Sequence, residues 1–415
     1  MIDLFREISQ TLSRNKLRTI LTGLSVSWGI FILIVLLGAG NGLKNGVESN
    51  FSDRATNSVT LWSGRTTMPY KGLKSGRQIE FTENEVNAIQ KEIKESDIIT
   101  PRIERSKNIS YKKEYGSYRI MGVMPGYSYI EKLKINNGRF LNELDIKEQN
   151  KVIVLDKKIS TLLFKDENPI GEYVNVEGLM FKVVGVNDKA AQWGSPIGYI
   201  PFSTAQTIYN PNEKINPIIF TINGLETLEE NERLSDDIRK LMGRQLNFDP
   251  SDKNALWINN NQAMYVETQK IFGAITTFVF IIGILTLIAG IVGVSNIMLV
   301  SIKERTREFG IRKAIGAKPF SILNTIVIES LLITSFFGYI GVLMGVGLTE
   351  LVNYVMEQST NGEEVQMTVF QNPTVNLQYV FIATLIIIVV GVISGYLPAR
   401  KAVRIKPIEA MRQEV

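Results

Sequence analysis

The residues with the clearest chemistry in this sequence belong to one short segment, residues 301–320, which lies between two long apolar runs. Six of its side chains are basic: Lys303, Arg305, Arg307, Arg312, Lys313 and Lys318. A basic loop beside membrane-spanning helices stays on the cytoplasmic side of the bilayer, where a soluble partner can bind it. The segment therefore predicts binding of a cytoplasmic partner, and its position determines the topology of the rest of the chain.

Several kinds of catalytic site are excluded by residue types alone. The chain has 415 residues with no His and no Cys, which excludes imidazole or thiolate metal ligands, triads that contain these groups, and disulfide bonds. A GxxxxGK[ST] phosphate loop is also absent, because the nearest imitation, Gly310 to Lys318, has the wrong spacing and is followed by Pro319. The chain is therefore interpreted as a non-enzymatic membrane subunit with no catalytic, metal-binding or cofactor-binding residue of its own.

Four apolar segments are long enough to cross a membrane. Their limits are 17–42, 271–300, 321–351 and 375–397. Each contains the roughly 18 apolar residues or more that predict a transmembrane helix. For the first segment the alternative is a cleaved signal peptide, although its apolar run is at the long end of the range for such peptides.

The distribution of charge predicts the orientation of these helices. Lys and Arg are concentrated before the first span, in 301–320 and in the tail 398–415, whereas residues 352–374 contain none. By the positive-inside rule both termini and the 301–320 loop are cytoplasmic, and residues 43–270 and 352–374 lie outside. The net charge of +5 is accordingly a topology signal in a multi-pass protein of the inner (cytoplasmic) membrane, and it does not imply nucleic acid.

The soluble segments predict the remaining architecture. In residues 43–270, strands and helices alternate around a β-rich middle, which predicts an inner subdomain at about 126–212. Thr82, followed three residues later by Glu85, predicts a capped helix start. Residues 1–16 predict an amphipathic helix on the inner membrane surface, with an ordinary soluble extension as the alternative. The predicted fold class is an α+β membrane protein: four transmembrane helices with a large extracytoplasmic α+β insert of two subdomains between helices 1 and 2.

The basic loop has a more specific sequence pattern than a topology signal requires. Glu308 and Arg312 form a favourable i, i+4 pair on a helix, and Phe309, Ala314 and Ile315 leave an apolar edge. Gly310 costs such a helix about 1 kcal/mol relative to Ala, which a partner surface could offset. The alternative is that the charges only anchor the topology.

At these residues the chain resembles a known family. The segment Glu304 to Ala317, ERTREFGIRKAIGA, is similar to the ERTREIGIRKAxGA signature of the MacB-type permeases, a mechanotransmitting ABC transporter superfamily that also includes the lipoprotein-releasing permeases and FtsX. Residues Leu397 to Ala402 and Pro407 to Arg412 resemble the ending of that family. Residues 138–140, 152–155, 169–171 and 181–186 resemble its extracytoplasmic core domain.

The resemblance implies a four-span permease that works as a dimer with two cytoplasmic ATPase domains. The loop after the second span, Ile302 to Ala317, would then be a coupling helix seated on the ATPase. The residues assigned to ATPase coupling are Glu304, Arg305, Arg307, Glu308, Gly310, Arg312, Lys313 and Gly316. Because this chain lacks the fused ATPase of MacB, a separate ABC ATPase subunit would bind ATP and Mg. The second permease is either an identical copy or a sibling.

Glu329 is the one ionisable group in the interiors of the predicted spans, away from their ends, where transporters of polar solutes usually place several. It is either an intramembrane coupling element or the partner in a snorkelling or interhelical hydrogen bond. Gly341-x-x-x-Gly345 and Gly391-x-x-x-Gly395 predict close helix packing, within one subunit before dimerisation.

Three functions compete on the sequence alone. The first is the permease of an ABC exporter of amphipathic compounds, peptides or lipoproteins, which transmits ATP hydrolysis mechanically to the outer domain. In that case a periplasmic adaptor and an outer-membrane channel are candidate partners alongside the ATPase, the second permease and membrane lipids. The second is an FtsX-like regulatory permease that controls an outer partner such as a cell-wall hydrolase. The third is a membrane-anchored sensor or binding module with no ATPase.

Overall fold

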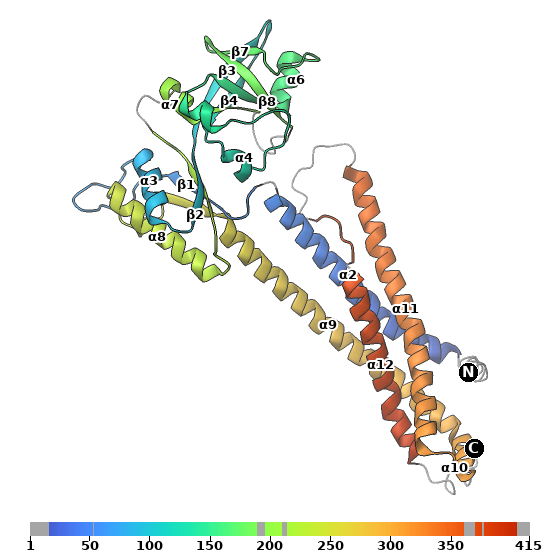
Figure 1. Cartoon of the computed structure of the whole chain (residues 1–415). Coiled ribbons are helices and arrows are strands. Elements are labelled where there is room, and N and C mark those ends of the chain that lie inside the picture. The colour runs from blue at the N-terminus through green and yellow to red at the C-terminus, as the bar shows by residue number, and fades with distance from the viewer. Residues whose placement is uncertain are drawn as a thin grey trace. The chain divides into compact units, whose positions relative to one another are not determined.

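A computed structural model of the chain describes residues 16–52, 54–188, 196–209, 214–360, 370–375 and 377–404 (Figure 1). The chain divides into two compact units. A helical unit combines Met1–Glu48 with Ile271–Val415, and an insert unit comprises Ser49–Lys270. The amphipathic helix predicted at 1–16 lies outside the described residues, apart from Lys16.

Among the described residues, the helical unit consists of four long helices and one short one. They are α2 (Lys16–Ser52), α9 (Asn261–Glu304), α10 (Thr306–Ala314), α11 (Pro319–Thr360) and α12 (Leu377–Val403). Among the described residues, four helices are long and apolar enough to cross a membrane: Gly23–Ser49, Asn261–Glu304, Pro319–Gln358 and Gln378–Val403. The four predicted spans are therefore confirmed as helices.

Helix α11 is longer than the predicted span 321–351. It continues to Thr360 because residues 351–360 contain neither Gly nor Pro to end it. The first part of the connection predicted at 352–374 is thus helical. Residues 361–369 of that connection are outside the described part of the chain.

Small residues hold the helical unit together at close range. Gly341 of α11 faces the backbone of Ser27 in α2, and Gly395 of α12 faces Ser330 of α11. The Ser330 hydroxyl donates to the carbonyl of Gly391 at 3.0 Å and lies 2.8 Å from the Ser394 hydroxyl. Packing within one subunit, as predicted for both small-residue patterns, is therefore present.

The insert unit contains two sheets. The first has the strand order β11-β1-β10-β2, and the second has the order β5-β8-β6-β9-β4-β3-β7. The strands are β1 (Ser58–Ser63), β2 (Ser96–Pro101), β3 (Ile103–Tyr111), β4 (Glu114–Val123), β5 (Ile135–Gly138), β6 (Val152–Asp156), β7 (Tyr173–Val176), β8 (Leu179–Asn187), β9 (Ile197–Pro201), β10 (Ile218–Ile222) and β11 (Leu256–Asn260). Buried side chains of both sheets, such as Phe220 and Phe181, belong to one apolar cluster.

Helices cover these sheets. They are α3 (Glu83–Glu92), α4 (Tyr127–Ile130), α5 (Glu143–Lys147), α6 (Lys157–Phe164), α7 (Phe202–Tyr209) and α8 (Leu228–Leu246). Helices α3 and α8 pack against each other beside the four-stranded sheet (Figure 1). The capping box predicted at Thr82 is present, with the Glu85 carboxylate accepting from the Thr82 backbone N–H at 2.7 Å.

The second sheet begins earlier in the chain than the predicted inner subdomain of 126–212. Strands β3 and β4 form a hairpin that pairs with β9 on one side and β7 on the other, so the seven-stranded sheet starts at Ile103. The sequence prediction started the inner subdomain at about residue 126 and so left the residues of β3 and β4 outside it. Their membership of the second sheet is decided by pairing with strands about 60 to 80 residues away.

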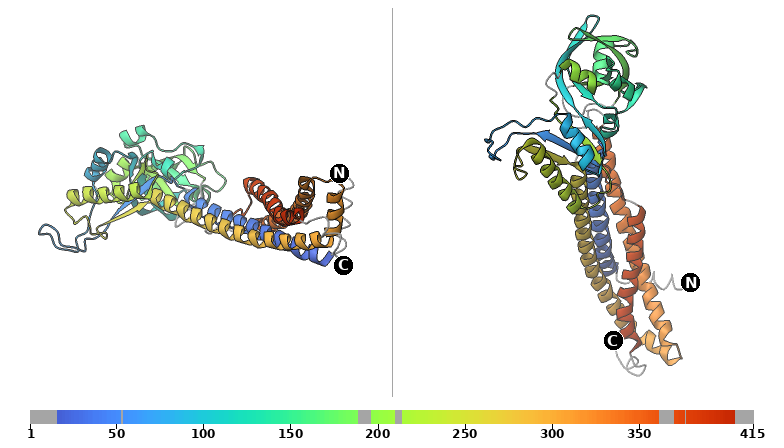
Figure 2. Two further views of the ribbon diagram at one scale, coloured as in Figure 1. Left: turned by 90° about the horizontal axis from the view of Figure 1, so that it is seen from below. Right: turned by 60° about the vertical axis from the view of Figure 1, so that its left-hand side comes forward.

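A hairpin at residues 64–79 projects from the insert unit beyond α3, as the separate views show (Figure 2). Its base is held by Asp252, which is buried and accepts hydrogen bonds from the backbone N–H groups of Thr67 at 2.6 Å and Met68 at 3.0 Å. The Thr67 hydroxyl donates to the same carboxylate at 2.8 Å. These bonds connect the hairpin firmly to the body of the unit.

Asp252 makes this attachment dependent on pH. Burial alone would raise the pKa of the Asp252 carboxyl, but the hydrogen bonds from Thr67 and Met68 outweigh it and leave the pKa below its ordinary value. The stabilisation is therefore complete above about pH 4 and is lost as pH falls through the folded-state pKa. We expect Asp252→Asn to lower the stability of the insert unit at pH 7 and to match the native chain at the lowest pH. Unfolding followed against pH tests this, and a gap that stays constant would contradict it.

Candidate functional site

Helix α10 lies between two of the membrane-crossing helices and is bounded by breaks that its sequence explains. Arg305, with φ −100° and ψ 13°, interrupts the helical path between α9 and α10. Gly316 takes a φ of +98°, a left-handed conformation that favours Gly, and Pro319 starts α11, a position where a missing N–H costs nothing. The coupling helix predicted for Ile302 to Ala317 is thus shorter, because residues 302–304 end α9.

Arg305 joins α10 to α11. Its Nη1 lies 3.2 Å from Oε2 of Glu329, while its Nε lies 2.9 Å and its Nη2 3.2 Å from the two carboxylate oxygens of Glu308. The Glu308 carboxylate in turn pairs with Arg312 at 2.6 Å. One guanidinium thus connects a carboxylate of α10 with a carboxylate of α11, using the fixed fork geometry of Arg.

Glu329 is the most buried member of this network. Glu329 is only 4% exposed and lies in a mostly apolar part of α11, so its charge needs a cation nearby. The guanidinium of Arg305 also lies 5.2 Å from the centre of the Phe309 ring. Glu308 and Arg312 are more exposed, and their pair is correspondingly weaker.

Two further contacts attach α10 to the bundle. Lys313 Nζ donates to the carbonyl of Val403 at 2.9 Å, at the C-terminal end of α12 where a cation is favourable. Phe309 and Gly310 are buried, and Phe309 belongs to the apolar cluster of the bundle together with Ile302 and Ile322. Movement of α10 would therefore be transmitted to α11 and α12.

The opposite side of α10 is open. Glu304, Arg307 and Gly316 are exposed, and so are the apolar side chains of Ile311 and Ile315, the latter by 82%. The predicted apolar edge of Phe309, Ala314 and Ile315 is therefore divided, since Phe309 points into the bundle and Ile311 adds to the exposed side. An exposed apolar patch rimmed by charges is typical of a surface that binds a protein.

The predicted coupling residues fall into two groups. Arg305, Glu308, Gly310, Arg312 and Lys313 form or surround the contacts to the bundle, while Glu304, Arg307 and Gly316 are on the exposed side. Two contacts were not predicted from the sequence. Arg305 pairs with Glu329, 24 residues away, and Lys313 pairs with Val403, 90 residues away. A single carboxylate in an apolar span was the only available signal for the first.

Comparison with known proteins covers both units. Residues 19–240 match the model of the MacB-like periplasmic core domain, and residues 259–407 match that of the FtsX-like permease C-terminal region. Curated relatives include the macrolide export ATP-binding/permease proteins MacB of Bdellovibrio bacteriovorus, 26% identical over 419 residues, and of Vibrio parahaemolyticus, 27% identical over 417 residues. The matches cover all of this chain but 62% and 60% of those relatives, so the chain spans about three-fifths of their length.

Two solved structures resemble part of this chain. The periplasmic region of MacB from Actinobacillus actinomycetemcomitans is 23% identical and covers 54% of this chain and 95% of its own, with a TM-score of 0.42. The extracellular domain of the noncanonic ABC-type transporter YknZ from Gram-positive bacteria is 18% identical, covers 49% of this chain and all of its own, and has the same TM-score of 0.42. The two family models decide the assignment: this chain belongs to the MacB-like permease family, in which a MacB-like periplasmic core domain precedes an FtsX-like permease region.

Proposed function

We propose that this chain is the permease subunit of an ABC transporter that couples ATP hydrolysis by a separate ATPase subunit to conformational change of its insert unit. ATP and Mg would bind to the ATPase. The driven process is export of amphipathic compounds, peptides or lipoproteins, in line with the name of the curated macrolide exporters. Both termini and α10 would lie in the cytoplasm, and two permease copies would form the complex.

The observation that carries the proposal is the double role of Arg305. Arg305 binds Glu308 on α10, a helix whose other side is exposed. It also binds Glu329, a buried residue of the membrane-crossing helix α11. A force applied by an ATPase to the exposed side of α10 would reach α11 through this guanidinium and α12 through Lys313. Such a pair of rigid contacts is what a mechanical coupling element requires.

Ile315 tests whether the exposed side of α10 binds the ATPase. We expect Ile315→Asp to weaken binding of the co-expressed ATPase by at least about tenfold, because it places a charge at the centre of an apolar contact. Binding is measured by titrating the purified ATPase onto the full chain in nanodiscs. Tyr115→Asp is the matched control, since Tyr115 is 81% exposed on the insert unit. Equal affinity of both variants for the ATPase would refute the assignment.

Export is tested separately from binding. Cells that express the native chain with its ATPase should lower their content of a fluorescent amphipathic compound, and cells with Ile315→Asp should not. If the ATPase binds and hydrolyses ATP normally but no compound leaves the cell, a regulatory role of the FtsX kind replaces export.

A single Cys placed at Ile315 tests the topology. Because the chain has no Cys of its own, this Cys should react only with reagents that enter the cytoplasm.

A further inference from the structure

The hairpin at residues 64–79 is strongly basic. It contains Arg65, Lys71, Lys74 and Arg77 and no acidic residue. Lys71 and Lys74 are exposed near its tip, together with the apolar side chains of Met68 and Leu73. A solvated loop has no need of this combination, whereas a surface that binds an acidic partner does.

The hairpin is also rigid. At its tip Tyr70 and Leu73 exchange two backbone hydrogen bonds, at 3.1 and 2.9 Å, around Lys71 and Gly72, which both have positive φ angles. These are the features of a type I′ turn. Below the tip, Thr66 accepts and donates backbone bonds with the opposite strand, and Asp252 holds Thr67 as described above. A binding element that is ordered in advance loses less entropy when it docks.

A complementary acidic surface exists on α8. From Glu226 to Asp236 the chain has five carboxylates, at Glu226, Glu229, Glu230, Glu232 and Asp236, and one base, Arg233. Glu226, Glu229, Glu232 and Asp236 are exposed, and Arg233 approaches Glu229 only to 3.9 Å. The hairpin has four cations and this acidic segment a net charge of −4, so the two surfaces match in charge.

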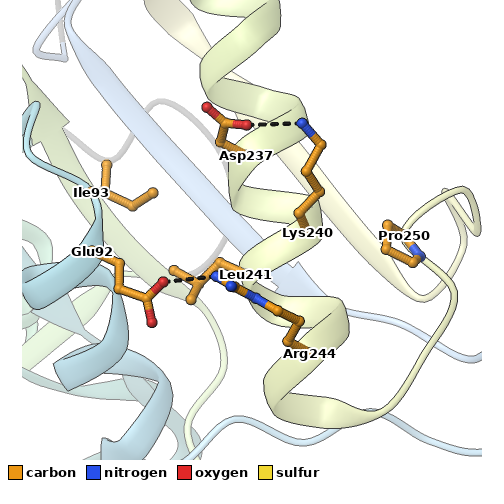
Figure 3. A pocket seen from close by; sticks show the side chains of 7 residues that line it. All are labelled: Glu92, Ile93, Asp237, Lys240, Leu241, Arg244 and Pro250. Carbon is orange, nitrogen blue, oxygen red and sulfur yellow. Dashed lines mark hydrogen bonds and ion pairs between the residues drawn. The ribbon is translucent and has the colours of Figure 1, made fainter.

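The rest of α8, residues 237–246, has one acidic residue, Asp237, and three basic ones, Arg239, Lys240 and Arg244, for a net charge of +2. Within α8, Asp237 pairs with Lys240 at 3.0 Å. Arg244 of α8 pairs with Glu92 of α3 at 2.7 Å, beside a groove of about 480 Å³ that residues of both helices line (Figure 3). Each carboxylate drawn in this groove therefore has its cation on the same molecule. The groove offers little charge to a partner, and the acidic segment is the better site.

The hairpin is fixed far from the start of its own acidic segment. Arg77 Nη2 donates to the carbonyls of Leu246 at 3.2 Å and Asn247 at 2.6 Å, which places the hairpin base at the C-terminal end of α8. Helix α8 has 19 residues, so its other end is about 27 Å away at 1.5 Å per residue. The hairpin also extends away from α8 in the views of the insert unit (Figure 2). Asp236, the near end of the acidic segment, is about 15 Å from Leu246 along the same helix, so this arrangement favours contact between molecules over contact within one molecule.

We infer that the hairpin of one copy docks on the acidic segment of α8 in a second copy of this chain. In a twofold dimer each hairpin would bind the α8 of its partner, which gives two equivalent contacts. The inference rests on the dimeric permease of the proposed function and adds an extracytoplasmic contact to it. Because the contact is ionic and exposed, it weakens as salt rises.

Disulfide cross-linking in membranes tests this directly, because the full chain contains no Cys. One copy carries Lys74→Cys and a differently tagged copy carries Glu232→Cys. On mild oxidation we expect a covalent pair of the two tags with at least about tenfold the yield of the control, since a disulfide forms only when the two Cα atoms approach within about 7 Å. The control pairs Lys74→Cys with Lys113→Cys, an exposed cation at the turn between β3 and β4.

Charge reversal provides the second measurement. Lys71→Glu in the copy that carries Lys74→Cys should lower the yield, and Asp236→Lys in the copy that carries Glu232→Cys should restore it. Equal yields for the acidic segment and the control, or the absence of restoration, would overturn the inference, as would cross-linking of Lys74→Cys to a different protein in place of the second copy. Titration of the ATPase onto the same membranes separates the two proposals, because ATPase binding without the cross-link refutes only the hairpin contact.

Discussion

Replacement of Arg305 by Met is expected to lower the free energy of unfolding by about 3–5 kcal/mol, the usual cost of removing one partner of a buried ion pair. Glu329, 4% exposed, would lose the guanidinium that neutralises it. The measurement is thermal unfolding of the full chain in detergent. Arg312→Met is the matched control, because Arg312 pairs with Glu308 at a surface where both side chains are about 40% exposed, and its loss should cost under about 1 kcal/mol.

The double variant Arg305→Met/Glu329→Met separates stability from coupling. With both charges removed, most of the lost stability should return, since apolar residues of similar size often replace a buried ion pair at little cost. ATPase activity should nevertheless stay uncoupled from transport, because the link between α10 and α11 is still absent. If the double variant is coupled like the native chain, Arg305 is only a structural residue. If Arg305→Met is as stable as Arg312→Met, the described ion pair is wrong.

Gly341→Ala is the second change with a large expected effect. A Cβ at Gly341 would overlap the carbonyl oxygen of Ser27 and lie 3.1 Å from its Cα, so α2 and α11 would have to separate. Backbone atoms cannot move away by a change of rotamer, as a side chain can. We therefore expect the free energy of unfolding to fall by about 1–3 kcal/mol. Thermal unfolding in detergent again provides the measurement.

Gly347, on the same helix, gives a control with the same chemical change. No atom lies within 4 Å of the position that its Cβ would occupy. Gly347→Ala should therefore be neutral or stabilise the helix by up to about 1 kcal/mol, the difference in helix propensity between the two residues. A loss of stability of the same size in both variants would show that the distance between α2 and α11 is not what limits substitution at Gly341.

Local patterns were sufficient for much of this fold. The four apolar segments predicted four long helices, and Thr82 with Glu85 predicted a helix start that is present as a full capping box. These features depend on neighbours within a few residues, or on composition over about 20 residues, so one sequence contains all that they need. The exact helix ends were predicted less well. Helix α11 extends to Thr360, beyond its predicted end at residue 351, because no breaker stops it.

For the candidate site, the sequence by itself determined which segment carries the charges and that it lies between two membrane-crossing helices. Only the tertiary structure decided what those charges do. It turned Arg305, Phe309 and Lys313 toward the bundle and left Arg307, Ile311 and Ile315 exposed, and it assigned β3 and β4 to the second sheet. The reason is that an ion pair or a strand pairing between distant residues is selected by the packing of whole elements, whereas helix formation and membrane insertion are selected by residues that are adjacent in the chain.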